Sequence, residues 1–305
     1  MAKKGRPKVE RLVKLDTQIE EALAADNPQS VRHVFYLMTD PTLPVSVDKT
    51  ERGYKLVQRR CVKLRRDGIV PYYWISDATR VGVRFRTRSA SGSVGLAASW
   101  HRVDPWNDAD VLVSVWCESR SVAGTIRNTC DDLCVSLYPC GGFASLSLTA
   151  DGARDIREDA RGRPVVILYI GDYDPAGVLI PQSVMGELEL HLPDFKLHQQ
   201  RLAITSAQAE GLPSKPRKAG EKRVPEIRQT VEVEAMPAGQ LRDVLTQAVG
   251  KYLPTGALER AQEQEKDEKH WLTQIATVIQ RQGVAGCAHA LEAYDEGSFP
   301  RPRRD

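Results

Sequence analysis

The sequence predicts an α/β protein in which a basic helical domain precedes a domain with a mainly parallel sheet flanked by helices. From Leu12 to about Arg80 the apolar residues recur at helical spacing. From Asp110 to about Val233 short β-rich runs alternate with helical segments. That alternation is expected when each strand is followed by a crossover helix that returns the chain to a parallel neighbour.

We expect the chain to divide into four parts. They are a flexible basic arm over 1–14, a basic helical domain over 15–95, an α/β domain over 105–237, and a C-terminal helical region with a basic tail over 238–305. The stretch from Ser89 to Ser99 is rich in Ser, Gly and Ala, and we expect it to mark the first domain boundary.

The composition indicates an ordinary globular protein, with 41% hydrophobic and 27% charged residues among 305. No apolar run is long enough to span a membrane, and the N-terminus lacks the apolar stretch of a secretory signal. We therefore expect a cytoplasmic protein with no membrane partner. The six cysteines form no C-x-x-C pair, which favours reduced, buried thiols over a zinc site.

Two helices are predicted in the N-terminal domain. Ser30 is a suitable N-cap for a helix over Val31–Met38. A second helix is predicted from about Lys49 to Asp67, with Val57, Cys61 and Leu64 at helical spacing on one face. Its remaining surface is basic and is the candidate DNA-binding face: Arg52, Lys55, Arg59, Arg60, Lys63 and Arg66. A helix, a turn and a basic helix favour a helix-turn-helix or winged-helix (CAP-like) unit that binds double-stranded DNA. Residues 81–88 alternate and are either a wing strand or the start of a linker.

Carboxylates follow two predicted strands of the α/β domain. Glu118 ends the apolar run that begins at Val111, and Asp172 and Asp174 follow the run over 164–170. Functional groups gather at the carboxyl ends of parallel strands, so these three side chains can share a divalent metal ion. Mg²⁺ suits such a site because it offsets carboxylate repulsion and leaves positions for phosphate and water. The alternative is structural, with Asp172 capping the next helix and Glu118 an ordinary strand-end acid.

The order of these features resembles the Toprim domain of topoisomerases, primases and some nucleases. An acid follows the first strand, a Gly turn at Gly141 and Gly142 follows the second, and Asp-x-Asp-x-x-Gly ends at Gly177. The resemblance implies that Glu118, Asp172 and Asp174 bind catalytic Mg²⁺, for which Mn²⁺ can substitute. It also makes Glu118 a candidate general acid or base.

A second resemblance concerns the nucleophile. The segment from Arg32 to Tyr36 resembles the Arg-x-x-Tyr-Tyr motif of the topoisomerase VI A subunit and the related meiotic double-strand-break proteins, with Phe35 replacing the first tyrosine. In that family the second tyrosine, here Tyr36, attacks the DNA phosphodiester. Arg32 lies one helical turn before Tyr36 and can hold the scissile phosphate. The rival hydroxyls of Tyr72 and Tyr73 are expected in a packed loop.

Two further segments support the same family. Glu232-Val-Glu-Ala-Met-Pro resembles the acidic segment after the Toprim core, with Glu234 in place of the usual Asp, so Glu232 and Glu234 are candidate auxiliary acids. The stretch from Ile69 to Arg80 resembles compact, stand-alone bacterial and phage members. We therefore expect a type II, topoisomerase VI A-like enzyme that forms a 5′-phosphotyrosyl link as a homodimer.

Strand passage would need a separate ATPase (B-type) subunit, because the chain has no Gly-x-x-x-x-Gly-Lys-Ser/Thr loop. Two other functions stay open. One is a hydrolytic Toprim nuclease in which Tyr36 is structural. The other is a non-catalytic DNA-binding protein on a Toprim scaffold.

Overall fold

The computed structural model describes residues 6–75, 87–144 and 146–295. They form two compact units, one from the described residues of 1–81 and 109–252, the other from those of 82–108 and 253–305. Most of the predicted wing strand lies outside the described residues.

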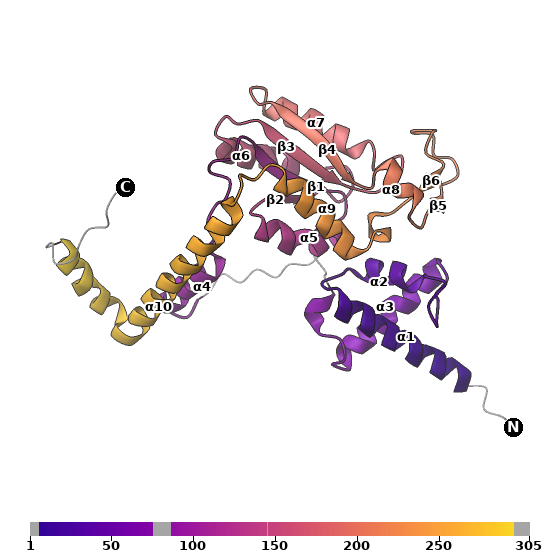
Figure 1. Ribbon diagram of the computed structural model, residues 1–305, viewed down its shortest axis with the longest axis horizontal. Helices are drawn as coiled ribbons and strands as arrows, with labels where there is room; N and C mark the ends of the chain where they lie inside the picture. The colour runs from indigo at the N-terminus through magenta and orange to yellow at the C-terminus, as the bar shows by residue number, and fades with distance from the viewer. Residues whose placement is uncertain (1–5, 76–86, 145, 296–305) are drawn as a thin grey trace. The chain divides into compact units, whose positions relative to one another are not determined.

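The N-terminal part of the first unit consists of α1 (Arg6–Ala25), α2 (Val31–Met38), α3 (Glu51–Arg66) and the short 3₁₀ helix η1 (Tyr72–Trp74) (Figure 1). The prediction for α2 is confirmed, and the Ser30 hydroxyl accepts the His33 N–H at its start. Residues 39–50 join α2 to α3, which is longer than the turn of about three or four residues in a helix-turn-helix. The winged-helix assignment therefore stays a prediction.

Residues 6–14 are helical, where a flexible arm was expected. Leu15, Ile19 and Leu23 recur at four-residue spacing in α1, and all three are buried. Burial of this stripe stabilises the helix, because tertiary packing supplies most of the stability of a helix in a globular protein. The basic residues at the start of α1 then continue the same helix toward the N-terminus.

The sheet of the first unit is wholly parallel, in the order β2-β1-β3-β4. Its strands are β1 (Leu112–Cys117), β2 (Ser136–Pro139), β3 (Val165–Ile170) and β4 (Leu197–Ala203). The sheet and its crossover helices confirm the predicted α/β class. The chain moves outward from β1 to β2 and then returns to the other side of β1 with β3. Ligand sites of open α/β sheets lie beside such a reversal of strand order.

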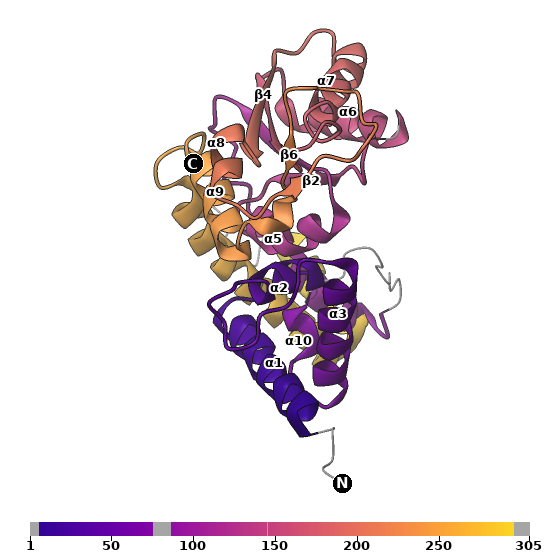
Figure 2. The same cartoon turned by 90° about the vertical axis from the view of Figure 1, so that its right-hand side faces the viewer.

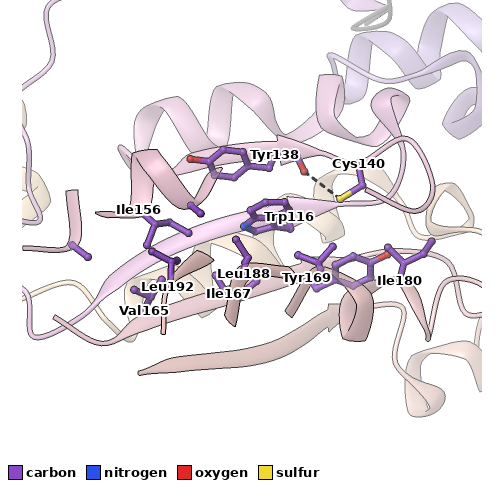
Figure 3. Close-up of a cluster of buried hydrophobic side chains, with 13 residues drawn as sticks. Trp116, Tyr138, Cys140, Ile156, Val165, Ile167, Tyr169, Ile180, Leu188 and Leu192 are labelled. Carbon is purple, nitrogen blue, oxygen red and sulfur yellow. Dashed lines mark hydrogen bonds between the residues drawn. The ribbon is translucent and has the colours of Figure 1, made fainter. Parts of the chain in front are cut away.

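Alternate residues of the central strands pack on opposite faces of the sheet. α6 (Leu146–Ala160) and α7 (Ile180–His191) pack together on one face, whereas α5 (Arg120–Asp132) and α9 (Ala238–Gly250) cover the other (Figures 1 and 2). Figure 3 shows the core of the first face, in which the Trp116 and Tyr138 rings stack with centroids 4.5 Å apart. Strands buried on both faces explain why the β3 segment reads as an unbroken apolar run.

The second unit pairs two helices that are distant in the sequence, α4 (Ala90–Trp100) and α10 (Ala257–Asp295). The Ser-, Gly- and Ala-rich stretch that was expected to be a boundary is therefore helical, and the Ser89 hydroxyl caps it by accepting the Gly92 N–H. Residues 238–305 were expected to form one region, but α9 belongs to the first unit and α10 to the second. Among the described helices, none is both long and apolar enough to cross a membrane.

His33 makes the stability of the first unit dependent on pH. The ring is 1% exposed, its Nδ1 lies 2.9 Å from the Ser30 hydroxyl, and its Nε2 has no hydrogen-bond partner among the described residues. Burial, together with nearby Arg242, lowers the pKa of His33 to about 3. An unfolded histidine has a pKa of about 6.5, so below that pH protons bind preferentially to the unfolded chain and stability falls.

We expect acidification from pH 7 to pH 4.5 to lower the free energy of unfolding by about 2–3 kcal/mol through His33 alone. Urea unfolding of wild type and His33→Gln at both pH values measures this contribution, because the variant lacks the titrating ring. Equal losses of stability in the two proteins would contradict the assignment.

Candidate active site

The carboxylates predicted from the sequence meet where β1 and β3 end. Glu118 directly follows β1, and its backbone N–H donates to the Ile170 carbonyl at 2.9 Å. Its side-chain Oε2 accepts the backbone N–H of Asp172 at 3.0 Å. The parallel register of the two strands therefore brings Glu118 and Asp172 together, as expected from their sequence positions.

Asp174 organises the turn that follows β3. One oxygen, Oδ1, accepts the backbone N–H groups of Ala176 at 2.9 Å and Gly177 at 2.6 Å. A Cβ atom at Gly177 would lie 2.1 Å from the Asp172 carbonyl oxygen and 3.0 Å from Glu118 Oε2. This turn accordingly requires glycine at position 177, and Asp174 has a structural task in addition to any role in binding.

Arg201 of β4 holds the loop that carries both aspartates. Its guanidinium donates to the carbonyl of Ile204 at 2.7 Å, of Gly177 at 2.9 Å and of Gly171 at 2.8 Å. It also donates to the Asp172 carbonyl at 2.5 Å. We did not predict this residue, since a single arginine in a strand carries no local signal and its four acceptors come from separate parts of the chain.

The segment after β6 (Gln229–Thr230) completes the acidic site. The Val233 N–H donates to Asp172 Oδ1 at 2.8 Å, which sets Glu232 and Glu234 on either side of this contact. Glu234 is 5% exposed, and its Oε1 accepts the Ser121 hydroxyl at 2.6 Å. The structure therefore brings both candidate auxiliary acids to the carboxylates of the sheet.

Burial and mutual repulsion favour the protonated forms of Asp172 and Glu118. Burial, followed by the charges of Glu118 and Glu234, raises the pKa of Asp172 to about 8. The pKa of Glu118 is also raised, chiefly by burial, with a further contribution from Asp174. A bound cation would relieve this repulsion.

The type of donor suits Mg²⁺, which prefers carboxylate oxygens, but the placement does not form a finished site. Over the described ranges of the chain, no three His, Cys, Asp or Glu side chains are grouped so that they could hold a metal ion. Glu118 Oε2 and Asp174 Oδ1 instead accept backbone N–H groups. Metal binding therefore stays a proposal for Glu118, Asp172 and Asp174.

Tyr36 and Arg32, both on α2, contact the segment after β6 through Glu232. The Tyr36 hydroxyl donates to Glu232 Oε2 at 2.8 Å, and Arg32 Nη1 donates to the same oxygen at 2.7 Å. The other oxygen, Oε1, accepts Lys215 Nζ at 2.6 Å. Lys49 Nζ lies 5.0 Å from the centroid of the Tyr36 ring. Lys215 and Lys49 were not predicted, because nothing in the local sequence relates either residue to Tyr36.

Tyr36 is held as a neutral phenol in this arrangement. The residue is 6% exposed. Burial, followed by the charge of Glu232, raises the pKa of its hydroxyl far above the ordinary value, while Arg32 opposes the shift. Attack on phosphorus by the oxygen of Tyr36 therefore requires a change in its surroundings.

Tyr72 and Tyr73, the rival hydroxyls, were expected in a packed loop, and that expectation is wrong. Their exposed fractions are 63% and 74%. Arg65 lies over the Tyr72 ring at 4.7 Å and donates to the Tyr72 carbonyl at 2.9 Å. η1 is thus anchored through Arg65 and its backbone, which leaves both tyrosine rings outside the core.

The basic residues of α3 divide into two groups. Val57, Cys61 and Leu64 form its buried face, as predicted. Arg60 is mostly buried in an ion pair with Asp16 of α1, whereas Lys55 and Lys63 form exposed ion pairs with Glu51 and Asp67. The exposed members are Arg52, Lys55, Arg59, Lys63 and Arg66.

Comparisons with protein-family models, with curated proteins and with solved structures found no match for this chain.

Proposed function

We propose that this chain cleaves double-stranded DNA by transesterification, with Tyr36 as the nucleophile. The supporting observation is the meeting of Tyr36 and Arg32 with Glu232, whose neighbour Val233 bonds to Asp172 at the end of β3. A hydroxyl nucleophile, a cation for the phosphate and a set of carboxylates from three distant segments are the groups that phosphoryl transfer needs.

In the proposed step the Tyr36 oxygen bonds to phosphorus and the bond from phosphorus to the 3′ oxygen breaks. The products are a 5′-phosphotyrosyl link and a 3′-hydroxyl. The proton of the phenol ends on the 3′ oxygen, in place of phosphorus. One ester replaces another, so the step is reversible without ATP. Arg32 would hold the phosphate oxygens, and the exposed basic residues of α3 would bind the DNA backbone.

The proposed enzyme is similar to the A subunit of topoisomerase VI. Two protomers would supply one Tyr36 for each strand, and a separate ATPase subunit would be needed for strand passage. Mg²⁺, or Mn²⁺ in its place, is the proposed cofactor; when bound by the sheet carboxylates it would neutralise charge on the phosphate.

A specific observation favours the hydrolytic alternative. Tyr36 is almost fully buried and its hydroxyl proton is held by Glu232, as expected of a structural tyrosine. In that case a metal-activated water would attack the phosphodiester and no covalent adduct would form.

Trapping the adduct tests the proposal. Plasmid and 3′-labelled linear DNA are incubated with the full chain in MgCl₂, MnCl₂ or EDTA, denatured with detergent and analysed for labelled protein. We expect an adduct with either metal, located on Tyr36 by mass spectrometry after nuclease digestion. Cleaved DNA with a free 5′-phosphate and no adduct would identify a nuclease. Binding without cleavage, unchanged by Asp172→Asn, would identify a DNA-binding protein.

A further inference from the structure

Two cations and a phenol hold the carboxylate of Glu232. Its two oxygens accept hydrogen bonds from Arg32, Tyr36 and Lys215, all between 2.6 and 2.8 Å. A phosphodiester, like a carboxylate, presents two oxygens that share one negative charge and accept hydrogen bonds from cationic side chains. The donors around Glu232 therefore suit a DNA phosphate as well as they suit a carboxylate.

The cationic side chains near Tyr36 carry more positive charge than the carboxylate of Glu232 neutralises. Lys49 forms no ion pair with any carboxylate in the part of the chain that the structure describes, and its ammonium donates to the Ser214 carbonyl at 3.2 Å. It lies near the face of the Tyr36 ring, as does Lys215, whose Nζ is 5.8 Å from the ring centroid. Glu234 interacts with Arg32 through its charge and accepts its hydrogen bond from Ser121, so three cations lie near two carboxylates here.

The chain positions these groups on separate elements. Lys215 lies on β5 (Lys215–Pro216), which pairs with β6 immediately before Glu232. Arg32 and Tyr36 lie one turn apart on α2. The side chains of Glu232 and Arg32 are 26% and 36% exposed, so both have a path to solvent, whereas Tyr36 is buried in α2.

We propose that Arg32, Lys49 and Lys215 form a phosphodiester-binding site around Tyr36, and that the carboxylate of Glu232 occupies the position of the phosphate until DNA displaces it. This inference rests on the proposed function, since it assigns the scissile phosphate to that site. Displacement of Glu232 would remove the acceptor that holds the Tyr36 hydroxyl and place phosphorus beside its oxygen. Lys49 and Lys215 become direct ligands of the DNA backbone.

The test measures DNA binding and requires no cleavage. A fluorescein-labelled duplex of 24 base pairs is titrated with wild type, Glu232→Gln and Glu226→Gln in EDTA at several salt concentrations, with anisotropy as the readout. Glu226 is an exposed acid of the same segment, so its variant removes the same charge away from Tyr36. We expect Glu232→Gln to bind about tenfold more tightly, and with a steeper salt dependence, whereas Glu226→Gln changes the affinity by less than about twofold.

Two lysine variants test the same site, and one of them does not depend on Glu232→Gln folding correctly. Lys49→Met should weaken binding about three- to tenfold in the wild-type chain, and Lys215→Met should cancel the gain of Glu232→Gln. Unchanged or weaker binding by folded Glu232→Gln, or equal gains from both glutamine variants, would overturn the inference. So would normal binding by Lys49→Met. Tighter binding without any covalent adduct would leave this site intact and refute only the cleavage mechanism.

Discussion

Tyr36→Phe is expected to abolish the covalent protein–DNA adduct and to lower the rate of strand cleavage by at least about 10³-fold. The substitution removes the only atom of this side chain that can attack phosphorus. The ring itself is retained, including its packing on Phe35, whose centroid is 5.5 Å away. Glu232 keeps its bonds to Arg32 and Lys215, so the loss of one hydrogen bond should cost only about 1–2 kcal/mol of stability.

Cleavage of supercoiled plasmid and thermal unfolding, measured on the same preparations, separate loss of chemistry from loss of fold. Tyr73→Phe is the matched control, because it removes a hydroxyl from a residue that is 74% exposed. It should leave both measurements unchanged. If Tyr36→Phe cleaves at the wild-type rate, or if Tyr73→Phe removes the adduct, then Tyr36 is not the nucleophile.

Gly177→Ala is expected to destabilise the first unit by about 2 kcal/mol or more and to disrupt the acidic site. The added Cβ would lie 2.1 Å from the carbonyl oxygen of Asp172, a backbone atom that cannot rotate away. The loop also cannot shift as a whole without breaking its bonds, because Arg201 holds its carbonyls and Val233 holds Asp172. The carboxylates of Asp172 and Asp174 should therefore move relative to Glu118.

Gly186→Ala is a control variant that should change the stability in the opposite direction. Gly186 lies inside α7, and an added Cβ meets no atom within 4 Å there. Alanine is the better helix former, so this variant should gain about 0.5–1 kcal/mol. Urea unfolding measures both effects. A Gly177→Ala protein as stable as wild type would show that the loop is less constrained than its contacts indicate.

Much of the fold was accessible from local patterns. The apolar run of β3, the N-cap of α2 and the apolar spacing of α3 are each read from neighbouring residues, and all three are confirmed. The errors have a common origin. The segment of α4 was taken for a domain boundary and residues 6–14 for an arm, since each becomes a stable helix only through packing that is distant in sequence.

The residue types of the candidate site were evident before the structure. A carboxylate at the end of each of two parallel strands, and an arginine one helical turn before a tyrosine, are patterns within short segments. Helical periodicity alone aligns Arg32 with Tyr36. Glu118 meets Asp172 because β1 and β3 pair in parallel, as expected for strand ends at one edge of a sheet.

What joins the two pairs is a contact between residues 196 positions apart, the hydrogen bond from Tyr36 to Glu232. The same kind of contact places Lys215 on Glu232 and Arg201 beneath the aspartate loop. No periodicity links such positions, because their proximity depends on how the sheet, the helices and the ribbon of β5 and β6 pack together. The sequence therefore determined the carboxylates, the tyrosine and the α/β class. The tertiary structure decided that Glu232 holds Tyr36 and that Arg32, Lys49 and Lys215 lie around this pair.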